Sequence, residues 1–216
     1  ITNSGTFSNP GTITSTGTFS STGTFTNTGT FTGTITNSGT LTTNSAFTGN
    51  VTNSGTLSGS GTITGNVTNS GTLAPGNSIG TMTITGDYTH NAGSTYQVEV
   101  NAAGQSDKLV VTGTATLNGG TVSVLAGSGT YNVSTTYTIL TAGSVVGTFG
   151  GVTSSLAFLI PSLTYDPTNV YLLLTRNTTG FADVADTSNQ YSVASSLDRV
   201  SGSATGDMAT VLNTLL

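Results

Sequence analysis

FTGTITNSGTLTTNSAFTGNVTNSGTLSGSGTITGNVTNSGTL, residues 31–73, repeats one spacing of large apolar residues, four, six and six positions apart, in a period of 16 residues. The period produces three apolar columns: Phe31, Phe47, Ile63 and Ile79; Ile35, Val51 and Val67; Leu41, Leu57 and Leu73. A repeat this short cannot bury an apolar face by itself, so it must stack on its neighbours. The stretch therefore predicts an all-β fold, a parallel β-helix with three short strands per rung and the columns pointing inward.

The turns between the predicted strands repeat as well. One corner carries an Asn, a Ser and a Gly in successive rungs; the asparagines are Asn37, Asn53 and Asn69, and the glycines are Gly39, Gly55 and Gly71. A polar turn followed by a residue that tolerates positive φ suits such a corner. We expect the asparagines to stack as a side-chain ladder. A second corner is predicted at Gly33, Gly49 and Gly65.

The composition agrees with an ordered β protein and excludes several other classes. Thr, Ser and Gly account for 49, 27 and 30 of the 216 residues, 5% of the chain is charged, and residues 1–86 contain no charged side chain. With three Lys or Arg residues and a net charge of −5, nucleic-acid binding is not expected. The chain has no Cys, which excludes disulfides and thiol chemistry. It opens in mid-repeat, so we expect it to be part of a longer protein.

A second group of motifs lies beyond the regular repeat. The first three are PGNSIGT (75–81), GDYTHNAGSTYQVEV (86–100) and QSDKLVVTGTATLNGGTVSV (105–124). They resemble the passenger-associated transport repeat of bacterial autotransporters, the type V secretion proteins. Residues 136–177 resemble the pertactin-like autochaperone region that ends such passengers, and FADVADTSNQYSVASSLDRV (181–200) resembles the junction that follows.

The resemblance implies a right-handed parallel β-helix displayed at the cell surface or secreted outside the outer membrane. It divides the chain into regular rungs at 1–80, continuing β-helix with an autochaperone-like cap at 81–180, and a helical linker at 181–216. The partner it implies is the protein's own C-terminal outer-membrane β-barrel, absent from this chain. Spacing of six also suits a left-handed hexapeptide β-helix with 18 residues per turn, so the handedness depends on the resemblance.

The most apolar segment, residues 155–175, predicts a hairpin that covers the last rung. Asp166, Pro167, Thr168 and Asn169 form its turn signal, with Pro at the second position. The residues expected to be buried in this cap are Leu156, Phe158, Leu163, Tyr165, Val170 and Leu172. A cap that folds first would present an edge on which incoming rungs add; the alternative is an inert cap.

Beyond Phe181 the sequence predicts two short amphipathic helices, the first opened by a capping box at Thr187 and Gln190. A loosely ordered linker is the alternative. No catalytic, metal or cofactor site is expected anywhere in the chain.

One pattern superficially suggests a hydrolase. Ser78 lies in a GxSxG motif, with Asp87 and His90 downstream, but the motif requires a strand-to-helix turn that a solenoid lacks. His90 is expected to be a polar surface residue. Asp107 and Lys108 are expected to form an exposed turn pair.

These patterns favour a non-enzymatic stalk and folding template. The alternative is an adhesin or virulence factor, self-associating or binding a host-surface ligand, because uncharged Thr and Asn ladders on neighbouring solenoids can hydrogen-bond side by side. An ice-binding solenoid is a further alternative, which a thermal-hysteresis assay without effect would exclude. The Thr pairs flank inward residues on all sides of the predicted rung, whereas an ice-binding solenoid presents its Thr array on one dedicated face.

Overall fold

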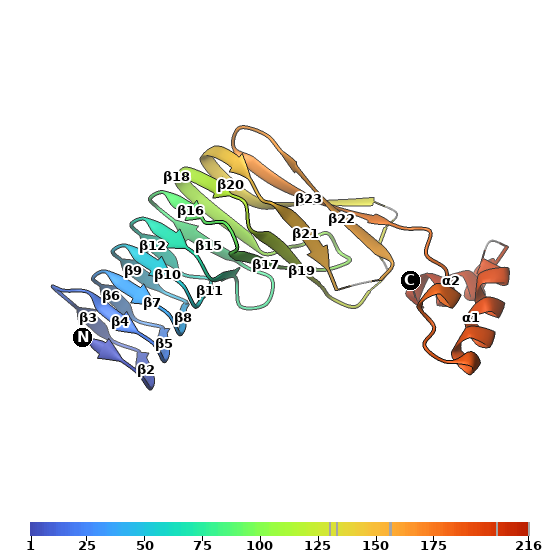
Figure 1. Ribbon diagram of the computed structural model, residues 1–216, viewed down its shortest axis with the longest axis horizontal. Helices are drawn as coiled ribbons and strands as arrows, with labels where there is room; N and C mark the ends of the chain where they lie inside the picture. The colour runs from blue at the N-terminus through green and yellow to red at the C-terminus, as the bar shows by residue number, and fades with distance from the viewer. Residues whose placement is uncertain (130, 133, 156, 202, 216) are drawn as a thin grey trace.

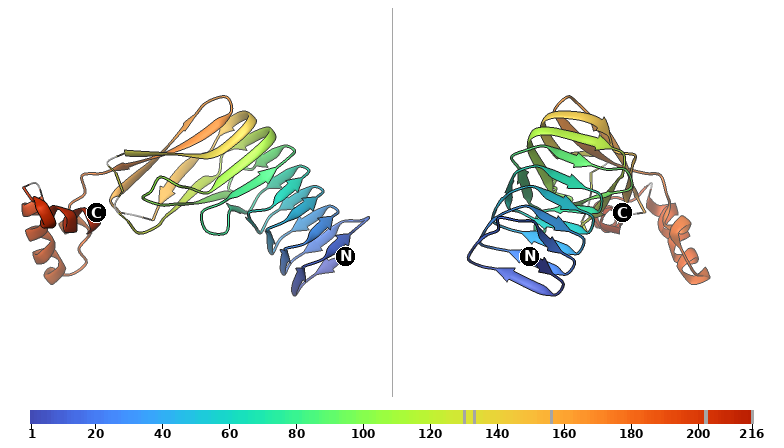
Figure 2. Two further views of the ribbon diagram at one scale, coloured as in Figure 1. Left: turned by 180° about the vertical axis from the view of Figure 1, so that it is seen from behind. Right: turned by 60° about the vertical axis from the view of Figure 1, so that its left-hand side comes forward.

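The computed structural model describes residues 1–216 except 130, 133, 156, 202 and 216, and it does not describe the side chains of 209, 210 and 213–215. The chain forms an elongated stack of rungs that begins at the N-terminus and ends in a hairpin region, with two helices beyond it (Figure 1). The rungs lie side by side along the stack in both further views (Figure 2). The predicted parallel β-helix is confirmed.

Three faces surround the core, because each early rung contributes one strand to each. Face 1 contains β1 (Thr2–Asn3), β4 (Phe19–Ser21), β7 (Ile35–Asn37), β10 (Val51–Asn53), β13 (Val67–Asn69) and β16 (Tyr88–His90). Face 2 contains β2 (Thr6–Asn9), β5 (Thr24–Asn27), β8 (Thr40–Thr43), β11 (Thr56–Gly59), β14 (Thr72–Pro75), β17 (Thr95–Val100), β19 (Thr121–Ala126) and β21 (Gly151–Ser154). Face 3 contains β3 (Thr12–Thr14), β6 (Thr30–Thr32), β9 (Ala46–Thr48), β12 (Thr62–Thr64) and β15 (Thr81–Ile84).

Strand pairing follows the predicted 16-residue register in the middle of the regular region. Val51 pairs with Ile35 on one side and Val67 on the other, and Leu57 pairs in the same way with Leu41 and Leu73. All six side chains are at most 1% exposed, so the columns fill the interior. The first rung differs, because Thr2 pairs with Ser20, which makes that turn 18 residues long.

One predicted column member is wrong. Ile79 lies outside any strand and is half-buried, and Ile84 takes the position above Ile63. The cause is an insertion in the rung: the segment 76–80 forms a loop after β14, in which Gly76 and Ser78 have positive φ, at 93° and 70°. The loop lengthens the rung without disturbing the column, because the extra residues stay at the corner.

The two glycine corners have different physical reasons for glycine. Gly33, Gly49 and Gly65 have φ of 144°, 138° and 149°, values that favour glycine. The predicted positive φ at the Asn-Ser-Gly corner is wrong, since Gly39, Gly55 and Gly71 do not have it. A Cβ at Gly55 would instead collide with the backbone oxygen of Gly39 in the preceding rung. Close stacking of the rungs therefore requires glycine at that corner.

Gly55→Ala is expected to lower the free energy of unfolding by about 1–3 kcal/mol, because a methyl group must be forced between two stacked backbones. Gly5→Ala is the matched control: Gly5 occupies the same corner of the first rung, and a Cβ there meets nothing within 4 Å. Urea denaturation of the two variants measures the difference. Equal destabilisation would show that the close approach of the rungs is not the reason for glycine.

Later rungs are longer and merge two faces. β18 (Lys108–Asn118) pairs with β15 through its first half and with β16 through its second, so faces 1 and 3 become one sheet. β20 (Ser134–Thr148) continues this sheet, and β23 (Asn169–Arg176) pairs with β20 in the antiparallel sense. β22 (Leu159–Tyr165) completes the hairpin with β23. The predicted hairpin is present; β23 pairs with the edge of β20, and β22 becomes the outermost strand of the merged sheet.

Three helical segments follow the hairpin: η1 (Phe181–Val184), α1 (Ser188–Ser201) and α2 (Gly206–Leu215). The capping box at the start of α1 is formed, since the backbone N–H of Gln190 donates to Thr187 Oγ1 and the backbone N–H of Thr187 donates to Gln190 Oε1. Asp198 of α1 accepts hydrogen bonds from the backbone N–H groups of Phe181 and Ala182. These bonds tie η1 to α1. Within the described residues, no helix is long and apolar enough to cross a membrane.

Candidate functional site: the asparagine ladder and the cap

The three asparagines of the repeated corner lie inside the stack. Asn37 pairs with Asn53 and Asn53 with Asn69 in the strand register of face 1, and all three side chains are 0% exposed. The Nδ2 group of Asn37 donates to Asn53 Oδ1 at 2.7 Å, and Asn53 donates to Asn69 Oδ1 at the same distance. Hydrogen bonds thus run from rung to rung along the inner corner.

The side-chain amides of Asn37 and Asn53 also donate hydrogen bonds to backbone carbonyl oxygens at the corner. Asn53 Nδ2 donates to the carbonyl oxygen of Gly55 in its own rung and to that of Thr72 in the next rung, at 3.1 and 3.0 Å. Asn37 makes the equivalent bonds to Gly39 and Thr56. Buried polar groups must be satisfied in this way. The Gly39 and Gly55 carbonyls also accept a backbone N–H from the next rung, so the ladder adds a second bond there and fixes the register of successive rungs.

A second, shorter ladder was not predicted. Asn9 and Asn27 are buried at the end of β2 and β5, and Asn9 Nδ2 donates to Asn27 Oδ1 at 2.8 Å. Asn27 in turn lies 3.4 Å from Thr43 Oγ1. The sequence signal was an Asn two positions after Phe7 and Phe25, the residues that face inward. It is hard to recognise because Thr43, Gly59 and Pro75 occupy the next positions of the same column.

The first ladder ends at His90, which corrects the expectation of a surface residue. His90 pairs with Asn69 in the register of face 1 and is 0% exposed. Its Nδ1 lies 2.7 Å from the Tyr88 hydroxyl. Burial lowers the pKa of His90 to about 4, with the backbone of Ser94 acting in the opposite direction, so the ring is neutral near pH 7. Leu117 follows His90 in the column, and the polar ladder gives way to apolar packing.

Asp107 is likewise buried rather than exposed, at 3% exposure. Its carboxylate accepts hydrogen bonds from the backbone N–H groups of Gly80 and Glu99, each at 2.9 Å. Burial raises the pKa of Asp107 to about 6, although these two hydrogen bonds lower it. The QSDKL motif therefore holds the PGNSIGT loop against β17, which places these two motifs in one structural unit.

The residues of the hydrolase-like pattern have separate partners. Asp87 Oδ1 accepts the backbone N–H of Thr114, and His90 contacts Tyr88. Ser78 is exposed in the corner loop rather than at a strand-to-helix turn. Within the described residues, no group of three or more His, Cys, Asp or Glu side chains could hold a metal ion.

The residues predicted to be buried in the cap differ in how far they are buried. Val170 and Leu172 of β23 are fully buried, together with Leu174 at 1% exposure. Leu163 and Tyr165 of β22 are half-buried and pack against the core, and Phe158 is also half-buried. Leu156 lies outside the described residues. The two strands of the hairpin thus contribute unequally, with β23 providing the buried face.

The turn of the hairpin is closed by side-chain bonds. Asp166 Oδ1 accepts the backbone N–H groups of Thr168 and Asn169 at 2.7 Å, and Asp166 Oδ2 accepts the Tyr171 hydroxyl at 2.7 Å. These bonds, the one from Tyr171 foremost, hold the pKa of Asp166 well below its usual range. Two backbone carbonyls of the turn, those of Pro167 and Thr168, accept N–H groups from β20. The turn is therefore fastened to the last rung.

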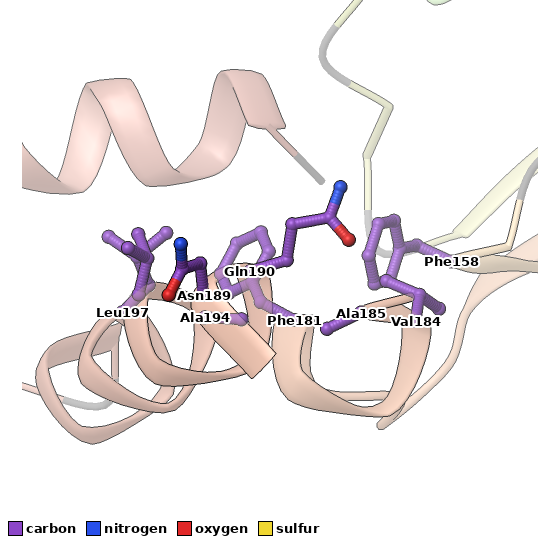
Figure 3. A pocket seen from close by; sticks show the side chains of 9 residues that line it. Phe158, Phe181, Val184, Ala185, Asn189, Gln190, Ala194 and Leu197 are labelled. Carbon is purple, nitrogen blue, oxygen red and sulfur yellow. The ribbon is translucent and has the colours of Figure 1, made fainter. Parts of the chain in front are cut away.

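A groove of about 560 Å³ lies between the hairpin and the helices (Figure 3). The rings of Phe158 and Phe181 meet edge-on there, with centroids 5.7 Å apart. The remaining lining residues are Val184, Ala185, Asn189, Gln190, Val193, Ala194 and Leu197. Large apolar side chains also remain exposed on this part of the chain; they are Val184, Tyr191, Val193, Val200, Met208 and Val211.

Threonines form two columns on the outside of face 3. Thr14, Thr32, Thr48 and Thr64 form one column, and a second column two residues earlier is Thr12, Thr30, Ala46 and Thr62. Face 1 presents a single central column, with Thr36, Thr52 and Thr68. Face 2 presents an unbroken column, Thr24, Thr40, Thr56 and Thr72, beside a mixed column of Thr26, Thr42, Ser58 and Ala74.

A comparison with curated proteins finds a relative of part of the chain. No known family model matches the chain. An extracellular serine protease of Serratia marcescens is 36% identical to it over 135 residues. The match covers 58% of this chain and 13% of that protein, so the chain spans a small part of the relative's length. The similarity relates this β-helix to part of an extracellular bacterial protein.

Proposed function

We propose that this chain is the C-terminal part of an autotransporter passenger, a non-enzymatic extracellular stalk that also provides the folding template for its own rungs. Three observations support the assignment: the parallel β-helix, the transport-repeat motifs joined by Asp107, and the similarity to an extracellular bacterial protein. The proposed partner is a C-terminal outer-membrane β-barrel of the same protein.

The buried face of β23 carries the template role. Val170, Leu172 and Leu174 are at most 1% exposed, and β23 pairs with β20 along most of its length. Because this hairpin is contiguous in sequence, it forms with a small loss of chain entropy. The first rung of a solenoid is the costly one, since later rungs add to an existing edge. A preformed cap therefore removes the slowest step from the folding of the stack.

The experiment is hydrogen-exchange pulse labelling during refolding of the full chain. Backbone amides of β20, β22 and β23 are expected to become protected first, followed by face strands in order from β19 back towards β2. Protection that arises simultaneously in all rungs, or first in β2–β12, would contradict the template role. An inert cap predicts no such order.

Self-association is the second candidate function, supported by the outer surface of the rungs. Residues 1–86 carry no charged side chain, and face 3 presents rows of hydroxyl groups that can act as donors and acceptors. Two such faces meet without charge repulsion. Light scattering of the chain at rising concentration is the test: a growing mass indicates self-association, and a constant monomer mass indicates a passive stalk.

A further inference from the structure

The inner asparagine ladder is interrupted in the second rung. Position 21 belongs to the ladder column, since it pairs with Asn3 on one side and with Asn37 on the other in the register of face 1, but it carries Ser in place of Asn. Ser21 and Asn37 are both 0% exposed. The interruption therefore lies inside the stack, between β4 and β7 (Figure 1).

Asn37 Oδ1 shows the consequence of the interruption. In the continuous part of the ladder, the Oδ1 atoms of Asn53 and Asn69 each accept the Nδ2 group of the preceding asparagine. Asn37 Oδ1 is buried and has no hydrogen-bond partner. Buried acceptors are nearly always satisfied in folded proteins, so this atom calls for an explanation.

The backbone of the corner does not supply a donor to Asn37 Oδ1. In the first rung, Asn3 Oδ1 accepts the backbone N–H of Gly5 at 3.2 Å. In the third rung the equivalent N–H, that of Gly39, donates to the carbonyl oxygen of Ser21, also at 3.2 Å. Asn37 Oδ1 therefore depends on a donor located between its own side chain and that of Ser21.

The hydroxyl group of Ser21 does not take over the role of an amide. A serine Oγ occupies the place of an asparagine Cγ, one bond short of the amide nitrogen. Ser21 Oγ accepts Asn3 Nδ2 at 3.2 Å and donates to the carbonyl oxygen of Gly23 at 3.4 Å. In the part of the chain that the structure describes, Ser21 gives no hydrogen bond to the carbonyl oxygen of Thr40. The residues equivalent to Thr40 in the other rungs all accept an asparagine Nδ2 there: Thr24, Thr56 and Thr72.

We propose that a single buried water molecule takes the place of the missing amide nitrogen and completes the ladder between Ser21 and Asn37. Ser is smaller than Asn by roughly the volume of one water molecule. The water donates to Asn37 Oδ1 and to the carbonyl oxygen of Thr40, and it accepts the Ser21 hydroxyl. Buried waters typically make about three such hydrogen bonds.

A metal cation would also be held by oxygen atoms, but the charges at this position disfavour it. Residues 1–86 contain no charged side chain, so no carboxylate compensates a buried cation there. A neutral ligand that both donates and accepts hydrogen bonds fits the three oxygen atoms. Water is the smallest such ligand.

The first test compares Ser21→Asn with the unmodified chain in urea unfolding. The introduced amide is expected to displace the water and to donate directly to Asn37 Oδ1. The unfolding constant is therefore expected to fall about 5-fold, because one immobilised water is released. Ser20→Asn is the matched control: Ser20 is adjacent on β4 and not buried, so the same added atoms are expected to change the constant less than about 2-fold.

The second test detects the water itself. Oxygen-17 relaxation dispersion of the solvent is expected to show about one long-lived water fewer for Ser21→Asn than for the unmodified chain, and no change for Ser20→Asn. In the unmodified chain, a nuclear Overhauser effect is expected between water and the β protons of Ser21.

Two results would overturn the proposed water site. One is an equal number of long-lived waters in all three chains, without a water signal at Ser21, which would mean that Asn37 Oδ1 is left unsatisfied. The other is an unfolding constant that rises in Ser21→Asn, because the space between the rungs would then not have the shape of the missing amide.

Discussion

Asn53→Ala is expected to lower the free energy of unfolding by about 3–4 kcal/mol, because it removes the central amide of a buried ladder. The substitution removes the Asn53 donor from Asn69 Oδ1 and from the carbonyl oxygen of Thr72, and it removes the Oδ1 acceptor of Asn37 Nδ2. The carbonyl oxygen of Gly55 keeps the backbone N–H of Thr72 as a donor, and the substitution leaves a cavity at a fully buried position. Each buried group left without a partner costs about 1–3 kcal/mol. Equilibrium unfolding in urea measures the loss.

Thr52→Ala provides the matched control on the same strand. Thr52 is exposed and adjacent in sequence to Asn53, so its replacement is expected to change the free energy of unfolding by about 0.5 kcal/mol or less. Asn53→Leu separates the two parts of the effect, since it fills the volume without restoring the hydrogen bonds. If Asn53→Leu were as stable as the unmodified chain, packing rather than the hydrogen bonds of the ladder would account for the stabilising effect of Asn53.

The sequence predicted the regular rungs well because each apolar residue there meets its own equivalent one period later. Ile35, Val51 and Val67 have the same neighbours in every rung, so local pattern and long-range contact coincide. The prediction failed at Ile79 because the corner loop inserts residues and shifts the period. Periodicity alone cannot indicate at which residue the register resumes after an insertion, here Ile84 rather than Ile79.

His90 and Asp107 were misassigned for a related reason. Both are polar residues in segments with turn-like composition, and local composition favours exposure. Their burial depends on distant partners: Asn69 in the preceding rung for His90, and Gly80, 27 residues away, for Asp107. The capping box at Thr187 and Gln190 and the turn at Asp166 were predictable, because both are closed within a few residues.

Leu172→Ala is expected to act mainly on the folding rate, whereas Leu41→Ala is expected to act mainly on unfolding. Both leucines are 0% exposed in central strand positions, so each substitution should destabilise the chain by about 2–5 kcal/mol. Leu172 lies in β23 of the cap, between Tyr137 and Leu163, and Leu41 lies in β8, between Phe25 and Leu57. If the cap forms before the rungs, the contacts of Leu172 already exist in the folding transition state, and those of Leu41 do not.

Stopped-flow refolding and unfolding of the two variants distinguishes the cases. For a loss of 3 kcal/mol that is mostly present in the transition state, refolding of Leu172→Ala slows about 30-fold. Refolding of Leu41→Ala stays within about 3-fold of the unmodified chain, and its unfolding accelerates instead. The opposite partition would place the nucleus among the early rungs. Since the two substitutions remove the same atoms from equally buried sites, a difference in partition reports the order of assembly rather than the size of the perturbation.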